Sequence, residues 1–227
     1  MKTLLIAALL FTFISVEQTT TFSDAKLPLQ SPADVSLSYG LVVDNSGSLH
    51  SQFSQVRSAA KTIAESTKSG DEGFIIKFVD SMKIETVQEL TQDSAKLVTG
   101  TNKFSIEGGQ TALLDAVYLS ATYLAEKGQA EGANRRHALI LITDGGERYS
   151  YYKVQQVLDT LHRTKVRDFA IGMTSSLLKD EGKKKYEKAI ALLNLLSTES
   201  GGKALFPADG DELQKDAKEI LNSIRND

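Results

Sequence analysis

Cysteine is absent from this 227-residue chain, and histidine is scarce. Without cysteine the mature protein carries no disulfide, and no leader can end in a lipid-modified cysteine. The three histidines, His50, His137 and His162, are too scattered in the sequence for the ligand spacing of a zinc site. The fold must therefore be held by its hydrophobic core, and a chain of this length can build one of sufficient size.

An excess of positive charge is also missing. The chain has 26 lysines and arginines against 29 aspartates and glutamates, which gives a net charge of −3. Nucleic acids and anionic membranes attract basic surfaces, so this balance argues against either as a partner. The sequence contains no low-complexity tract and no internal repeat, and a single domain accounts for its length.

The apolar run at residues 4–14 is too short to span a bilayer comfortably, which takes roughly 20 residues. It follows Met1-Lys2-Thr3, and a charged start before a short apolar stretch is typical of a secretory signal peptide. We expect residues 1–23 to form this peptide, with an uncleaved amino-terminal helix as the alternative. Residues 24–34 predict a flexible lead-in. The protein is then expected in a periplasm or outside the cell, with no transmembrane anchor after cleavage.

The segment Leu41-Val42-Val43-Asp44-Asn45-Ser46-Gly47-Ser48 is an apolar run that ends in one carboxylate and two hydroxyls. A fully apolar strand is typical of a sheet covered on both faces, and such sheets place ligand sites beyond the carboxyl ends of their strands. Asp44, Ser46 and Ser48 can direct three hard oxygen atoms at one point, which suits Mg²⁺, Ca²⁺ or Mn²⁺. The same residue types also form ordinary turns, so this segment alone supports both interpretations equally.

Two further segments place polar residues in comparable positions. Thr111 follows Gly108-Gly109-Gln110 and precedes a helical pattern, while the apolar run at 138–143 ends in Asp144 and then two glycines. Thr111 is also a good N-cap residue, and capping a helix is compatible with binding a metal. Asp115, one turn into the same helix, favours the helix dipole and need not be a ligand.

Together the three segments resemble the von Willebrand factor type A domain and its metal-ion-dependent adhesion site, as found in bacterial secreted proteins of that family. The family pattern of Asp-x-Ser-x-Ser, Thr and Asp is matched by Asp44, Ser46, Ser48, Thr111 and Asp144. The resemblance covers residues 35–226. It implies that the strand ending in Asp44 lies beside the strand ending in Asp144. It also implies a divalent cation, Mg²⁺ first and Mn²⁺ or Ca²⁺ as alternatives, whose shell an acidic side chain of a partner protein completes.

The hydrophobic pattern predicts a doubly wound α/β fold, with a mostly parallel central sheet, one antiparallel edge strand and helices on both faces. The strands are expected at 35–44, 73–79, 82–87, 138–143, 168–172 and 203–206. The helices are expected at 53–66, within 93–104, and at 111–127, 151–165, 186–199 and 211–224. The turn at Asp80-Ser81 is too short for a parallel crossover, which makes the third strand the antiparallel one. Residues 173–187, with Lys183-Lys184-Lys185, are interpreted as a solvated insertion rather than as a surface for an acidic partner.

The leading functional hypothesis is a secreted, metal-dependent protein-binding domain without catalytic residues. Near the motif the only imidazole is that of His50, and no nucleophile is assigned to it. The enzymatic alternative is a Mg²⁺-dependent phosphohydrolase of the haloacid dehalogenase type, which needs a second carboxylate two residues after its nucleophilic aspartate. Ser46 occupies that position, so the proton donor is missing. A third hypothesis is that the metal is purely structural, or that the domain is a structural subunit of an envelope assembly.

Overall fold

The computed structural model describes residues 35–129, 135–180 and 182–226. The predicted signal peptide and lead-in, residues 1–34, lie outside these ranges. The strands are β1 (Ser36–Asp44), β2 (Glu72–Phe78), β3 (Ile84–Thr91), β4 (Arg135–Thr143), β5 (Arg167–Gly172) and β6 (Lys203–Leu205). The helices are the 3-10 helix η2 (Gly47–Gln52) and the α-helices α1 (Phe53–Glu65), α2 (Ser94–Thr101), α3 (Leu113–Lys127), α4 (Val154–Thr164), α5 (Ser175–Asp180), α6 (Lys183–Glu199) and α7 (Gly210–Asn226).

The strands form one six-stranded sheet in the order β3-β2-β1-β4-β5-β6. β3 pairs antiparallel with β2, and the remaining neighbours are parallel. The predicted fold class is therefore confirmed, including the antiparallel edge strand. The pairing of β1 with β4 is also confirmed, with Val43 opposite Ile142.

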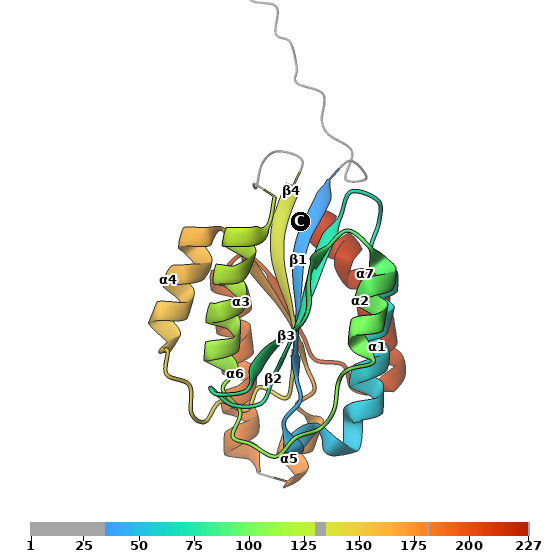
Figure 1. The fold of residues 1–227 in the computed structure, drawn as a ribbon. Coiled ribbons are helices and arrows are strands. Elements are labelled where there is room, and N and C mark those ends of the chain that lie inside the picture. Colours follow the sequence, from blue (N-terminus) through green and yellow to red (C-terminus); the bar gives the residue numbers. More distant parts are fainter. Residues whose placement is uncertain (1–34, 130–134, 181, 227) are drawn as a thin grey trace, which may run out of the picture. The chain divides into compact units, whose positions relative to one another are not determined.

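Alternate residues of β1 face two different helical layers, as the period of a strand requires. Leu41 and Val43 belong to a core shared with α1 and α7, whereas Val42 belongs to a core shared with α3, α4 and α6. Figure 1 shows the sheet nearly edge-on between these layers. At Gly40 a Cβ atom would lie 2.3 Å from the ring of Phe74, so glycine is what allows this close packing at the centre of the sheet.

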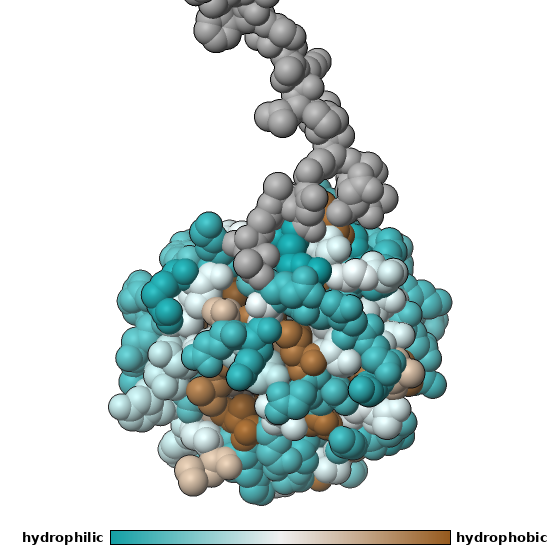
Figure 2. All heavy atoms as spheres, turned by 45° about the horizontal axis from the view of Figure 1, so that its top comes forward, coloured by the Kyte–Doolittle hydropathy of each residue, from teal (hydrophilic) through white to brown (hydrophobic). Residues whose placement is uncertain are grey.

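β3 forms one edge of the sheet and is longer than predicted. The strand is predicted at 82–87 but runs from Ile84 to Thr91, because an edge strand exposes one face and tolerates the polar residues beyond residue 87. Glu85 and Glu89 are exposed, and charged side chains on an edge strand discourage pairing with another chain. Figure 2, with the amino-terminal end of β1 brought forward, shows a mostly hydrophilic surface on which hydrophobic residues appear in separate small areas.

The link at 173–187 is not the simple insertion that the sequence predicted. It contains the short helix α5, and α6 begins at Lys183, three residues before the predicted start. Lys183, Lys184 and Lys185 are exposed, as expected, but they form the first turn of α6 rather than a loop. The basic residues are therefore held on a helix, in fixed positions relative to the sheet.

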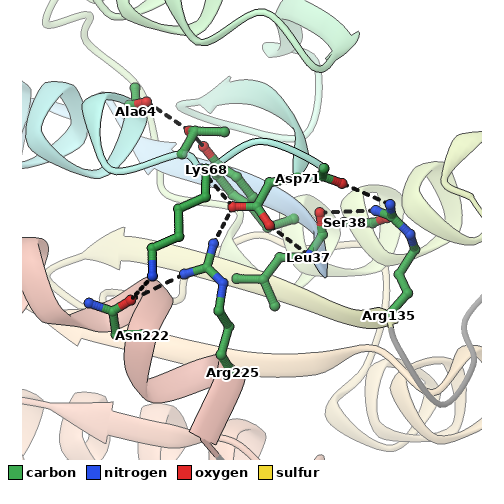
Figure 3. Close-up of polar contacts among 11 residues, drawn as sticks. Leu37, Ser38, Ala64, Lys68, Asp71, Arg135, Asn222 and Arg225 are labelled. Carbon is green, nitrogen blue, oxygen red and sulfur yellow. Dashed lines mark hydrogen bonds and ion pairs between the residues drawn. The ribbon is translucent and has the colours of Figure 1, made fainter. Parts of the chain in front are cut away.

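The carboxyl end of α7 is tied to the amino-terminal end of β1 by a buried polar cluster (Figure 3). Arg225 of α7 donates a hydrogen bond to the buried carboxylate of Asp71, which also accepts hydrogen bonds from the backbone N–H groups of Leu37 and Lys68, both at 2.9 Å. The Lys68 ammonium group donates to Asn222 Oδ1 at 2.9 Å. These contacts fix α7 at the end of the sheet opposite the predicted site.

Candidate metal centre

The two predicted carboxylates lie at the same edge of the sheet. Asp44 is the last residue of β1, and Asp144 directly follows β4. Because β1 and β4 are parallel neighbours, both strands deliver their aspartates to the same edge. Thr111 lies two residues before the start of α3.

The first loop, which follows β1, links its three predicted residues in sequence, Asp44 to Ser46 and Ser46 to Ser48. Asp44 is completely buried, and its Oδ1 accepts a hydrogen bond from the backbone N–H of Ser46 at 2.8 Å. Its Oδ2 accepts a hydrogen bond from the Thr143 hydroxyl of β4 at 2.7 Å. The hydroxyls of Ser46 and Ser48 are 3.1 Å apart. The carboxylate is thus fixed from both strands, with two hydroxyls beside it.

Thr111 and Asp144 come together around Gly146. The backbone N–H of Gly146 donates to Asp144 Oδ1 at 2.8 Å. A Cβ atom at residue 146 would lie 3.0 Å from that oxygen and 4.0 Å from the Thr111 hydroxyl oxygen. The Thr111 carbonyl also accepts a hydrogen bond from the Arg148 N–H at 3.0 Å. This contact joins the second loop, which precedes α3, to the third loop, which follows β4. A glycine at 146 leaves the space into which both side chains project.

Burial and like charge both act on the site. Burial raises the pKa of Asp44 to about 7, the nearby charge of Asp144 adds to the rise, and hydrogen bonds from Ser46 and Thr143 offset part of it. Two carboxylates held close together away from water repel each other, and a divalent cation between them would offset this repulsion and lower the pKa of Asp44. The available ligand atoms are carboxylate and hydroxyl oxygens, which are the ligands that Mg²⁺, Mn²⁺ and Ca²⁺ prefer.

Asn45 holds the loop after β1 in place, a role that the sequence does not predict. It is completely buried between the ligand candidates Asp44 and Ser46. Its side-chain amide donates to the Ser105 carbonyl at 2.8 Å, and its own carbonyl accepts from the Glu107 N–H at 3.0 Å. Asn45 thereby joins the first loop to the segment that leads to Thr111. No signal in the sequence distinguished it from an ordinary turn asparagine.

The amino terminus of α3 is capped by Glu147 and not by Thr111, so the capping role suggested for Thr111 is wrong. The N-cap position is Ala112, and the Leu114 N–H donates to Glu147 Oε2 at 3.0 Å. Asp115 accepts hydrogen bonds from the Tyr151 and Tyr152 N–H groups at 3.0 and 2.8 Å. Because the third loop caps the helix, the Thr111 hydroxyl is not needed for this purpose.

The model of the von Willebrand factor type A (VWA) domain matches residues 40–219, a range that holds all five predicted ligands. The chain belongs to this family. VWA domains typically mediate binding between proteins. A search of curated protein sequences gives no match for this VWA protein.

Several solved structures share the fold of this VWA domain at low sequence identity. The pilus adhesin SpaC of Lactobacillus rhamnosus GG, in an open conformation, has a TM-score of 0.65 at 15% identity, covering 84% of this chain and 30% of that one. BatB of Bacteroides thetaiotaomicron has a TM-score of 0.62 at 15% identity, with coverages of 84% and 100%. An aerotolerance-related membrane protein of Bacteroides fragilis has a TM-score of 0.61 at 16% identity, with coverages of 84% and 98%. In the described part of this chain, no helix has the length and apolarity to cross a membrane.

Two clefts of the VWA domain adjoin the candidate site. One, of about 620 Å³, lies between the loop after Asp144 and helix α6; the other, of about 610 Å³, lies against the β2–β3 turn. Gln110 and Tyr149 line both, so they form the ridge between them. Tyr149 is 66% exposed and Met82, in the second cleft, is 92% exposed. Large apolar side chains at such exposure are typical of binding surfaces when they gather around a polar site.

Proposed function

We propose that this VWA domain is an exported protein-binding module that works through a divalent cation. Asp44, Ser46, Ser48, Thr111 and Asp144 would hold the ion, and a glutamate or aspartate of the partner protein would complete its shell. The observation that carries the proposal is the convergence of two buried carboxylates and three hydroxyls at the carboxyl edge of the sheet. Mg²⁺ is the expected ion, with Mn²⁺ or Ca²⁺ as alternatives.

The ligand set suits a bridge better than a closed structural site. Only two of the five ligands are charged, the other three are neutral hydroxyls, and not all five need bind the ion directly. Mg²⁺ keeps several waters in such sites, and a carboxylate from outside can replace one of them. The attraction between the ion and the incoming carboxylate then contributes to the affinity for the partner.

We further propose that the domain has no catalytic activity. A phosphohydrolase of the haloacid dehalogenase type would need a carboxylic acid at residue 46, where the chain has a serine whose hydroxyl contacts Ser48. His50 is exposed in η2, beyond the ligand candidates of the first loop. VWA domains are generally interaction modules, which agrees with this proposal.

Export rests on the signal-peptide pattern of residues 1–23. The mature amino terminus of the protein recovered from a periplasmic or extracellular fraction, determined by mass spectrometry, tests it. An intact Met1 in that fraction, or recovery only from the cytosol, would contradict cleavage and export.

Titration calorimetry of the purified protein with Mg²⁺, Mn²⁺ and Ca²⁺ tests the metal site. We expect saturable binding by the wild type, loss of binding in Asp44→Ala, and unchanged binding in Asp80→Ala, which removes a nearby carboxylate at the β2–β3 turn. Circular dichroism on each protein controls for folding. If chelation unfolds the wild type, the metal is structural, and if the wild type binds no ion, the proposed bridge is wrong.

A further inference from the structure

The cleft beside α6 differs in charge from the rest of the protein. Its lining includes three cationic side chains, Arg148, Lys185 and Lys188, and one carboxylate, Glu147. The chain as a whole has a net charge of −3, so an excess of positive charge in one concave surface is a local feature. Concave surfaces lined by one sign of charge attract ligands of the opposite sign.

Glu147, the single acidic residue in the cleft lining, accepts hydrogen bonds from α3 and from Ser150. Glu147 Oε2 accepts hydrogen bonds from the Leu114 N–H at 3.0 Å and the Ser150 hydroxyl at 2.8 Å, and Oε1 accepts one from the Ser150 N–H at 3.0 Å. Arg148 and Lys185 have polar contacts of their own within the protein, which an entering anion would share. With three cationic side chains against one carboxylate, the lining residues carry a net positive charge.

The cleft is joined rigidly to the candidate metal site. Gly145, next to Asp144, has a φ angle of +79°, and a Cβ atom there would lie 2.9 Å from the Cβ of Ala189 on α6. The loop that carries Asp144 thus packs directly against the helix that carries Lys185 and Lys188. A ligand bound to both would span two surfaces whose spacing is fixed.

Apolar side chains also line this cleft. Leu177 and Leu192 lie on its α5 and α6 side, and Tyr149 forms its rim. A small inorganic anion would leave these apolar surfaces unused, whereas a peptide that alternates acidic and aliphatic residues would cover them. The charge and the apolar lining together favour an acidic protein segment as the occupant.

We propose that this cleft is the second contact point of the partner, which is an extended acidic segment with one carboxylate at the metal and another beside Lys185 and Lys188. This inference rests on the proposed metal bridge and adds the chemistry of the partner to it. Lys185, which belongs to the predicted solvated insertion, is then part of a recognition surface, because α6 presents it and Lys188, three residues apart, to the cleft.

The test uses the labelled peptide Glu-Leu-Glu-Leu-Glu, with Gln-Leu-Gln-Leu-Gln as its uncharged control, in fluorescence anisotropy with Mg²⁺ or with EDTA. We expect the acidic peptide to bind the wild type in Mg²⁺ only. The double variant Lys185→Glu/Lys188→Glu should bind it about tenfold more weakly, since each exposed ion pair contributes modestly. The variant Lys215→Glu/Lys218→Glu makes the same charge change on exposed positions of α7 and should bind as the wild type does.

Calorimetric Mg²⁺ titration of the same proteins separates the two proposals. If Mg²⁺ binds the wild type but the acidic peptide does not, the inference about the cleft is wrong and the metal site stands. The same holds if the acidic peptide binds both double variants equally well. If Mg²⁺ does not bind the wild type, the metal bridge fails and this inference fails with it. Displacement of the peptide by an equal concentration of inorganic phosphate would identify a general anion site and would also overturn the inference.

Discussion

Replacing Asp71 with alanine should destabilise the domain without altering the residues of the candidate site. The Asp71 side chain is 1% exposed and accepts hydrogen bonds from Arg225, from the Leu37 N–H and from the Lys68 N–H (Figure 3). In the alanine variant the guanidinium of Arg225, itself 4% exposed, would keep Asn222 Oδ1 at 3.3 Å as its remaining side-chain acceptor among the described residues. Two backbone N–H groups would lose their acceptor as well.

The expected loss follows from the burial of both partners. Removal of one member of a buried ion pair costs about 3–5 kcal/mol, because the other charge stays buried without compensation. That is a large fraction of the roughly 5–15 kcal/mol by which a domain is usually stable. With a urea m-value of about 2 kcal/mol per M, the unfolding midpoint should fall by roughly 2 M.

Urea unfolding followed by circular dichroism measures this shift. Lys61→Ala is the control, because Lys61 pairs with Glu65 on the surface, where the two side chains are 52% and 54% exposed, and its loss should cost less than about 1 kcal/mol. The double variant Asp71→Leu/Arg225→Met removes both charges and should recover much of the loss. A midpoint for Asp71→Ala equal to that of Lys61→Ala would refute the reasoning.

Three further predictions concern Gly146, Glu147 and Asp168. Gly146→Ala places a Cβ 3.0 Å from Asp144 Oδ1, so it should weaken Mg²⁺ binding in calorimetry while changing the unfolding free energy by less than about 1 kcal/mol. The control Gly108→Ala places its Cβ in open space and should leave both the Mg²⁺ affinity and the unfolding free energy unchanged. Equal Mg²⁺ affinities of the two variants would contradict the role of Gly146. Glu147→Ala removes the cap of α3 and should lower stability by about 1 kcal/mol in urea unfolding, and an unchanged midpoint would show that the cap is dispensable. Burial raises the pKa of Asp168 to about 7, so the folded state holds this proton more tightly than the unfolded state, and the stability of the wild type should fall as the pH rises from about 4 to about 7. Asp168→Asn should therefore be more stabilising at pH 8 than at pH 5 in urea unfolding, and a difference independent of pH would contradict this.

The parts of the fold that the sequence predicts well are those with local causes. The run that ends in Asp44 and the run that ends in Asp144 identify buried parallel strands, because each is continuously apolar and then stops at turn-forming residues. The short turn at Asp80-Ser81 indicates an antiparallel pair for the same local reason. These features place Asp44 and Asp144 at the ends of strands, whereas the adjacency of the two strands and the full set of five ligand candidates come from the resemblance to the VWA family.

The features that the sequence does not predict depend on contacts between distant residues. Glu147 caps α3 although 33 residues separate it from Leu114, whereas the local pattern favours Thr111 as the cap. Which lysines near residue 185 line the cleft depends on how α6 packs against the loop after Asp144. Lys183 pairs instead with Glu187 one turn away on the exposed surface. No local pattern distinguishes these two environments.

The buried carboxylates of Asp71 and Glu72, near the amino end of β2, have different partners from the carboxylate of Asp44, and this contrast bears on the proposed metal. At the amino ends, Asp71 contacts Arg225, and Glu72 lies 3.8 Å from Arg135, so the chain supplies its own cations. At the carboxyl end, burial and the charge of Asp144 raise the pKa of Asp44. The groups that lower this pKa are neutral donors, the hydroxyls of Ser46 and Thr143 and the N–H of Ser46. Asparagine could form the same turn at either position without this repulsion. The use of two aspartates here supports the proposed divalent cation.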